Sequence, residues 1–441
     1  MDQIQISTST KAIELEKLDQ GDTEIETNPS NVIEKLEQGQ LQSKVPEGGL
    51  WAWLMVAGGF CLSFSTFGYV VSWGTYQGFY ESELLADKTP SQIAWIGSLQ
   101  YSLIFLPGIF AGRLFDLGYF KATLIVCSAF MTVANFLIAE CTKYWHFVLC
   151  QGILLGLSAG CVYIPCIAVV SHWFNRRRPL AFALVAFGAS IGGIVYPIMI
   201  RNLLPKVGFK WTVRTIAFLN TATFVIAIVT MRTRLPPPST LPKLFDMKSL
   251  TSPAYLFYVF STLVSLLGLF TPLTFVSVSA TLIGIDSNFA FYLVAIANAA
   301  SAVGRVTSGI LAVAYGPVNV LAVFTVFATI FTYIWPFVTT KGAFIGITIL
   351  YGITSGAFNC LFAVPAAQFG DPGDVGRRTG TQMTIMAFGA LAGPPISGAI
   401  KQDHPTFHEV GIYAGTMVAA SVFLMMASKY CAQGRLWGGR F

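Results

Sequence analysis

Long apolar runs dominate the chain after residue 46, and their spacing predicts its class. About twelve runs of roughly 20 residues follow one another, separated by polar bends. Each run is long enough to cross a hydrocarbon layer of about 30 Å as a helix, which satisfies its own backbone hydrogen bonds in lipid. The pattern therefore predicts an all-α membrane protein with twelve transmembrane helices.

The predicted helices form two sets of six, divided by a polar break from Arg232 to Ser252. We predict helices at residues 50–75, 92–112, 122–140, 147–171, 179–200, 211–232, 254–280, 288–313, 317–337, 342–366, 378–400 and 410–429. The domains that follow are a tail at 1–46, an amino-terminal bundle at 47–232, a linker at 233–252, a carboxy-terminal bundle at 253–430 and a tail at 431–441.

Composition agrees with this class. The chain is 54% hydrophobic and 11% charged, with a mean hydropathy of +0.64, whereas soluble domains carry about 25% charged residues. The length leaves no room for a sizeable soluble enzyme domain. Residues 1–46 are acidic and contain no aromatic residue, so we expect a disordered cytoplasmic tail.

An even number of crossings puts both termini on one side of the membrane. Lys and Arg gather in the bends after the second, fourth, sixth and tenth helices, which places these bends and both termini in the cytoplasm. One bend disagrees, since it would carry its bases outside: Arg201, Lys206, Lys210 and Arg214. We keep the cytoplasmic assignment and expect the plasma membrane.

The chain shows no pattern for catalysis or for a cofactor. Its four histidines, His146, His172, His404 and His408, lie scattered near predicted helix ends, and its eight cysteines lack paired metal-ligand spacing. We expect no enzyme activity, no cofactor and no metal. The basic bends are too short for nucleic acid, so the expected partners are a small-molecule substrate and the lipid bilayer. The oligomeric state stays open, and a monomer fits the sequence.

A weak internal repeat links the two halves. "GRLFDLGYFKATL" from Gly112 follows the second helix, and "GRVTSGILAVAYGPVNVL" from Gly304 lies at the matching place in the second half. Asp116 can accept hydrogen bonds from a neighbouring helix start or a loop arginine, so Asp116 and Arg113 are candidate gating residues. With the six-plus-six layout, this repeat resembles the major facilitator superfamily.

Further stretches narrow the resemblance. They are "PEGGLWAWLMVAGGF" from residue 46, "HWFNRRRPLAFALVAFGASIGG" from 172, "NAASAVGRVTSG" from 298 and "DVGRRTGTQMTIMAFGALAGPPISGAI" from 374. Together they resemble the monocarboxylate-porter family, most closely its fungal branch. The resemblance implies a secondary transporter for monocarboxylates, vitamins such as riboflavin or secondary metabolites, working by alternating access, and it does not select among them.

Arg305 is the candidate that stands out. It lies inside the predicted helix 288–313, where a charge costs at least about 2.5–3.5 kcal/mol, so it should face a wet cavity or a partner. In the monocarboxylate-porter family, which the chain resembles, the matching arginine helps to hold the substrate carboxylate. The alternative is that Arg305 braces helix carbonyls, as its repeat counterpart Arg113 at a helix end suggests.

The sequence departs from the carboxylate carriers at two places. They have an Asp four residues before the arginine, where this chain has Ser301, and a Lys in the first helix, where the region around Ser72 and Trp73 offers no base. We therefore expect a neutral or weakly acidic, partly aromatic substrate, or facilitated passage rather than proton cotransport.

Other candidates are polar or aromatic residues in apolar surroundings. As lining we predict Tyr69, Trp73, Tyr76, Tyr163, Asn298, Asn359 and Phe362, with inter-helix packing as the alternative for each. In the predicted helix 378–400, Gly393 precedes Pro394 and Pro395, which free backbone carbonyls and should bend the helix. These three are further gating candidates.

Transport of a small organic metabolite is the favoured function. The alternative is a transporter-derived nutrient sensor that signals through its cytoplasmic tail, but such a sensor needs a longer extension than residues 1–46 offer. Substrate, direction and proton coupling stay open.

Overall fold

The computed structural model describes residues 47–235, 251–369, 375–404 and 406–435. Every regular element within these residues is a helix, which confirms the all-α prediction. The predicted tail at 1–46, most of the linker 233–252 and the last residues of the tail 431–441 lie outside the described residues.

The first half of the chain supplies the amino-terminal bundle. Its helical segments are α3 (Leu50–Ser63), η1 (Phe64–Gly68), α4 (Tyr69–Val71), α5 (Trp73–Phe79), η2 (Tyr80–Leu84), α6 (Pro90–Phe105), α7 (Gly108–Asp116), α8 (Phe120–Ile138), α9 (Tyr144–Phe147), η3 (Val148–Leu154), α10 (Leu155–Ser171) and α11 (Arg178–Thr230). Thr89 begins α6 with a capping box, in which its hydroxyl accepts from the backbone N–H of Gln92 and the Gln92 side chain accepts in return.

One break in α11 sets the number of crossings. The segment runs for 53 residues, but Gly208 has φ 74° and ψ 172°, a conformation open to glycine, and divides it into two spans. Among the described residues, eleven helical stretches are long and apolar enough to cross a membrane, and α11 is one of them. Its division yields the predicted twelve crossings.

The second half supplies the carboxy-terminal bundle. Its segments are α13 (Pro253–Gly268), α14 (Thr271–Leu282), α15 (Ser287–Tyr315), α16 (Pro317–Ile334), η4 (Trp335–Phe337), α17 (Lys341–Leu361), α18 (Ala363–Gln368), α19 (Val375–Asp403) and α20 (His408–Gln433). These segments make six stretches of membrane-spanning length, and α13 packs on both α19 and α20.

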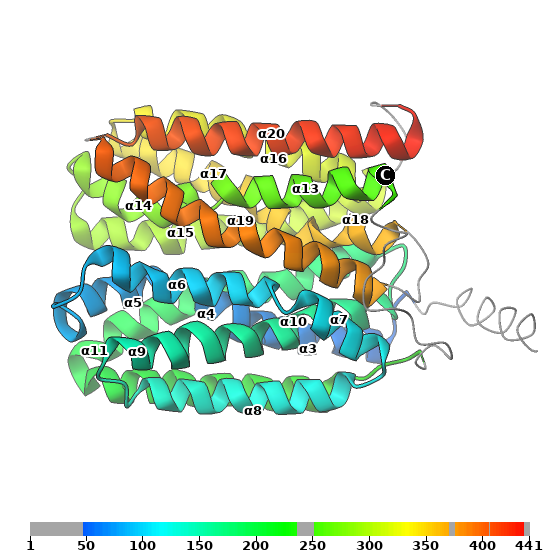
Figure 1. Cartoon of the computed structure of the whole chain (residues 1–441), viewed down its shortest axis with the longest axis horizontal. Helices are drawn as coiled ribbons and strands as arrows, with labels where there is room; N and C mark the ends of the chain where they lie inside the picture. The colour runs from blue at the N-terminus through cyan, green and yellow to red at the C-terminus, as the bar shows by residue number, and fades with distance from the viewer. Residues whose placement is uncertain (1–46, 236–250, 370–374, 405, 436–441) are drawn as a thin grey trace, which may run out of the picture. The chain divides into compact units, whose positions relative to one another are not determined.

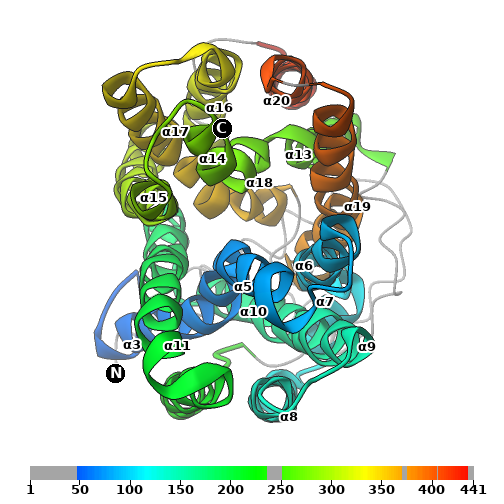
Figure 2. The same cartoon turned by 90° about the vertical axis from the view of Figure 1, so that its left-hand side faces the viewer.

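The two bundles meet along two helix pairs. Figure 2 shows α11 beside α15, and α6 and α7 beside α19. Glycine makes the second pair close, because a Cβ at Gly112 would overlap the carbonyl oxygen of Gly376, and one at Gly380 would overlap that of Gly108. Small residues therefore bring backbones into contact across the boundary, the usual means of tight helix packing in membranes.

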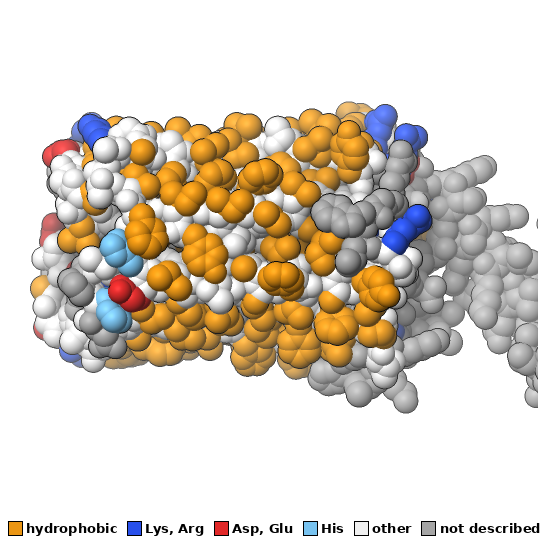
Figure 3. Space-filling model, turned by 90° about the horizontal axis from the view of Figure 1, so that it is seen from above, with side chains coloured by type: hydrophobic (Ala, Val, Ile, Leu, Met, Phe, Trp, Pro, Cys, Tyr) orange, Lys and Arg blue, Asp and Glu red, His pale blue; other side chains and the backbone are white. Residues whose placement is uncertain are grey.

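Both described ends of the helical region lie at one end of the bundles. In Figure 1, α3 begins and α20 ends at the right-hand end, which we call the termini face. Figure 3 shows hydrophobic side chains covering the flank, while charged side chains gather near the ends. Large apolar side chains such as Phe110, Phe218 and Phe423 are exposed, as expected where lipid is the solvent.

The basic bend between Arg201 and Arg214, which did not fit the positive-inside rule, makes specific local contacts. Glu140 pairs with Lys210 at 2.8 Å and with Arg214 at 2.6 Å. Arg201 lies 4.8 Å from the ring centroids of both Phe291 and Tyr292 on α15. These bases therefore have local partners on the face opposite the termini, which accounts for their presence there.

Candidate functional site

A cavity lies between the two bundles, near mid-depth. Its empty space is about 420 Å³, and we call it the central cavity. Its lining comes from both bundles and consists of Ser63, Phe67, Val71, Tyr101, Phe105, Tyr163, Ala189, Leu266, Phe270, Arg305, Phe358, Asn359, Phe362 and Met386. Ligand sites have mostly apolar walls with a few polar groups, and this lining has that character.

Arg305 is the cation of the central cavity. It is 4% exposed, and its guanidinium donates to the carbonyl oxygen of Ala186 on α11. Its Nε also donates to Ser301 Oγ at 3.3 Å. Arg305 thus lines the cavity and also donates to a backbone carbonyl. Its geometry is compatible with both predicted roles, binding a substrate and bracing the helices. No carboxylate is present in the described lining of this cavity.

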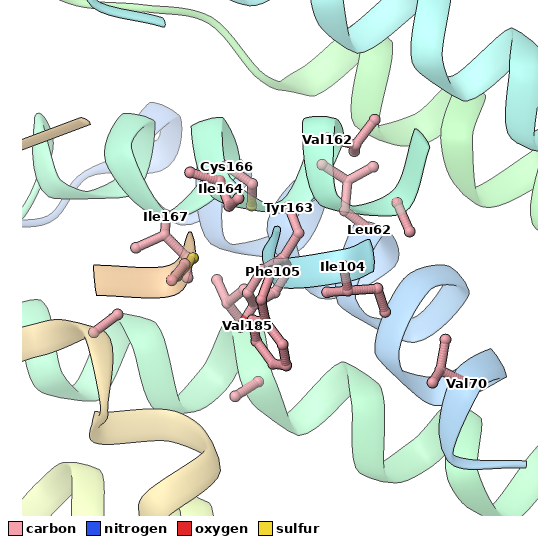
Figure 4. Packing of buried hydrophobic residues seen from close by; sticks show 14 of the residues in the cluster. Leu62, Val70, Ile104, Phe105, Val162, Tyr163, Ile164, Cys166, Ile167 and Val185 are labelled. Carbon is pink, nitrogen blue, oxygen red and sulfur yellow. The ribbon is translucent and has the colours of Figure 1, made fainter. Parts of the chain in front are cut away.

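Aromatic rings form much of the remaining wall. Tyr163 meets Phe67 edge-on with centroids 4.5 Å apart, and Tyr101 meets Phe270 of the other bundle at 4.9 Å. Figure 4 shows Tyr163 and Phe105 among buried apolar side chains of the amino-terminal bundle. Ring faces and edges of this kind stack on planar ligands, while the guanidinium binds oxygen acceptors.

Four predicted lining residues come together here: Arg305, Tyr163, Asn359 and Phe362. The other four predicted lining residues, Asn298, Tyr69, Trp73 and Tyr76, lie outside this cavity. Asn298 is buried against Gly193 and donates to the carbonyl oxygen of Val294 at 2.9 Å.

Tyr69 belongs to a separate aromatic group inside the amino-terminal bundle. Its ring centroid is 5.5 Å from that of Tyr76 and 5.6 Å from that of Tyr196. Neither Tyr69 nor Tyr76 lines the central cavity, and Trp73 packs against Gly97. For these residues the packing alternative matches the observed contacts.

The structure adds aromatic lining that the sequence pattern did not single out. Tyr101 and Phe105 lie four residues apart on α6, and Phe358 lies four residues before Phe362. Residues at this spacing share one helix face. Aromatic pairs one turn apart were therefore a usable signal for these positions.

Asp116 occupies the position predicted for a latch. It is buried at the end of α7, and a Cβ at Gly376 in the first turn of α19 would lie 2.5 Å from its Oδ1. The start of a helix favours negative charge, so the carboxylate suits this place between the bundles. Arg113 is half-buried one turn earlier on the same helix. Their gating role stays a prediction.

The other gating candidates lie within one bundle. Gly393 packs closely on the backbone of Leu266 and Leu267 in α13. The helix α19 continues through Pro394 and Pro395 to Asp403. Their role in gating also stays a prediction.

Comparison with known proteins identifies the architecture. The family model of the Major Facilitator Superfamily matches residues 59–394. The chain is 34% identical to "MFS-type transporter 1" of Ophiocordyceps sp. (strain BCC 1869) over 87% of this chain and 86% of that protein. It is 32% identical to "Aspyridones efflux protein apdF" of Emericella nidulans over 87% of this chain and 79% of that protein.

Solved structures share the fold. The fucose:proton symporter FucP of E. coli superposes with a TM-score of 0.66 at 16% identity, covering 87% of this chain and 98% of FucP. The human organic anion transporter MFSD10 superposes with a TM-score of 0.64 at 14% identity, covering 85% of this chain and 97% of MFSD10. The predicted two-bundle, twelve-helix fold is thereby confirmed.

Proposed function

Because this chain belongs to the major facilitator superfamily, it is a secondary transporter of a small organic metabolite, and we propose that the central cavity is its substrate site. The observation that carries the proposal is the position of Arg305, which faces the cavity from one bundle and contacts the other. A substrate held there touches both bundles, as alternating access requires. We propose no chemical change of the substrate, since the relatives of this chain are named as transporters.

The lining supports a substrate that is planar in part and carries an oxygen acceptor. Tyr101, Phe105 and Phe358 offer ring surfaces, and Arg305 and Asn359 offer donors. A neutral or weakly acidic aromatic metabolite satisfies both requirements. The finer resemblance to monocarboxylate porters stays a prediction, and the proposal does not depend on it.

Export is the proposed direction. It is supported by the relative named as an efflux protein for aspyridones, which is similar over most of its length. We further propose the plasma membrane as the location, with the termini face in the cytoplasm, since Arg176 and Arg177 lie exposed at that face. The nutrient-sensor alternative gains no support from the relatives or the fold.

A transport assay with purified protein tests the proposal. Proteoliposomes are loaded with a panel of labelled aromatic metabolites, both neutral and weakly acidic, and efflux is compared with vesicles lacking protein. We expect saturable movement of at least one planar member, competed by related compounds and lost in Arg305→Ala. If none of the panel moves while the protein remains folded, the proposed substrate class is wrong.

A further inference from the structure

A second cavity lies next to the central one, on the side of the termini face. Its empty space is about 260 Å³, and it is lined by Tyr163, Ile167, Val170, Phe182, Val185, Cys360, Phe362 and Ala363. Tyr163, Ile167 and Val170 follow one another along α10 toward its end at the termini face. We call this space the inner cavity, and its walls are almost wholly apolar.

Two aromatic residues belong to both cavities. Tyr163 comes from α10 of the amino-terminal bundle, and Phe362 comes from the join between α17 and α18 of the other bundle. We propose that Tyr163 and Phe362 form an aromatic gate, which separates the central cavity from the inner cavity and closes the transport path toward the termini face. This inference deepens the proposed function, since it assigns the exit from the same site.

The backbone of Phe362 is fixed by its own bundle. The helix breaks at this residue, and its carbonyl oxygen accepts from Tyr258 Oη at 2.6 Å and from Gln382 Nε2 at 2.8 Å. Both donors are buried in α13 and α19. Because these bonds fix the main chain, we assign the opening of the gate to rotation of the Phe362 side chain.

The Phe362 ring packs on two other rings of the cavity wall. Its centroid lies 6.2 Å from that of Phe105, nearly perpendicular, and 6.1 Å from that of Phe358, nearly parallel. Such aromatic contacts are worth about 0.5–1.5 kcal/mol each beyond their burial. Closure is therefore stable, and a bound substrate that offers its own ring surface can compensate for the lost contacts.

A thicker closure lies beyond the inner cavity. At the termini face, α7 packs on α19 through Gly112 and Gly376, and Gly309 of α15 packs on Ala183 of α11. The path toward this face is thus shut twice, first by two side chains and then by packed helices. Opening the helices alone would leave the aromatic gate in place.

Cys360 supplies a reporter for this gate. It is buried, and it lines the inner cavity but not the central one. In a variant where Cys360 is the single remaining cysteine, reconstituted in nanodiscs, the rate of reaction with a small methanethiosulfonate reagent measures access to the inner cavity. Both faces are open to the reagent in nanodiscs, so the measurement does not depend on orientation or on any substrate.

Phe362→Ala and Tyr163→Ala should each raise the labelling rate of Cys360 by about tenfold, the ratio that corresponds to about 1.4 kcal/mol in the closing equilibrium. Phe270→Ala removes a ring that lines only the central cavity and packs on Tyr101, not on Tyr163 or Phe362, so it should leave the rate unchanged. Tyr163→Phe keeps the ring and should also leave it unchanged.

The two alanine variants lie in different bundles, so a folding defect in one leaves the other as a test. Unchanged labelling in a folded Phe362→Ala or Tyr163→Ala protein would refute the gate, as would an equal rise in Phe270→Ala. A protein that moves none of the metabolite panel can still show the predicted labelling, which separates failure of the gate from failure of the proposed substrate class.

Discussion

The guanidinium of Arg305 on α15 donates to the carbonyl oxygen of Ala186 on α11, across the boundary between the two bundles. The same side chain lines the central cavity. A substrate oxygen placed in the cavity would compete with the Ala186 carbonyl for the guanidinium donors. Substrate binding would then loosen one inter-bundle contact, which couples occupancy of the site to motion of the halves.

Replacement of Arg305 tests this coupling. Arg305→Ala should reach the membrane folded but lose at least about tenfold in transport, because a hydrogen bond from a charged donor is worth about 1.5–3 kcal/mol. Arg305→Lys should restore only part of the rate, since it lacks the planar fork of donors. The initial transport rate of each variant, measured in proteoliposomes, tests this prediction.

The bracing alternative makes a different prediction for the same variants. If Arg305 only supports the packing of α15 on α11, both substitutions should lower the melting temperature and surface delivery in parallel with transport. Normal transport by a well-folded Arg305→Ala protein would remove this residue from the site.

Transport should depend weakly on a proton gradient. Ser301 lies one turn from Arg305, where a carboxylate would exchange protons, and the described lining of the central cavity contains no Asp or Glu. A protonophore added at constant membrane potential should therefore change accumulation little. A collapse of accumulation under these conditions would reveal a proton carrier outside the cavity.

The fold could be predicted from the sequence because hydropathy reports directly on helices in lipid. The turn at Gly208, which divides α11 into two spans, falls between the predicted helices 179–200 and 211–232. The site was predicted only in part. Arg305 stood out because a buried charge is costly. Tyr69 and Asn298 are also polar residues in apolar helices, but they pack inside the protein and do not line the cavity. Hydropathy does not distinguish these two roles.

Glu47 provides a prediction about stability. Its carboxylate accepts from the backbone N–H groups of Asn175, at 2.9 Å, and Arg177, at 3.0 Å, just before α11 begins. An anion at a helix start satisfies donors that the helix leaves unpaired. Glu47→Ala should cost about 1–2 kcal/mol, as loss of a helix cap does.

The melting temperature in detergent measures the Glu47 effect. Glu83→Ala is the matched control, since Glu83 lies exposed in η2, at the other end of the first crossing, and its loss should leave the melting temperature unchanged. Equal melting temperatures for the two variants would show that the Glu47 contacts add nothing to stability.

The stability of the protein should depend on pH through His172. It follows α10 at the termini face, and burial together with the charges of Arg178 and Arg234 lowers its pKa to about 4. In the unfolded chain a histidine has a pKa of about 6.5. The unfolded state therefore binds the proton first, so stability is complete above pH 6.5 and falls as pH drops toward 4.

The substitution His172→Gln removes this titration. The melting temperature of the parent should fall relative to that of the variant between pH 6.5 and 4, while other groups shift both proteins alike. Parallel curves over this window would mean that folding does not lower the pKa of His172.

Two glycines separate packing within a bundle from packing between bundles. A Cβ at Gly304 would overlap the carbonyl oxygen of Ile353, inside the carboxy-terminal bundle, whereas one at Gly380 would overlap that of Gly108 in the other bundle. Gly304→Ala should cost about 1–3 kcal/mol in stability, because neither packed helix can yield. Gly380→Ala should keep its melting temperature, since the bundles can part at the termini face. It should instead raise the rate at which thiol reagents reach Cys360 in the single-cysteine protein. Gly346→Ala, where a Cβ meets nothing within 4 Å, is the control for both.

A loss of stability in Gly380→Ala equal to that in Gly304→Ala would show that α7 and α19 form a fixed contact and do not separate during transport.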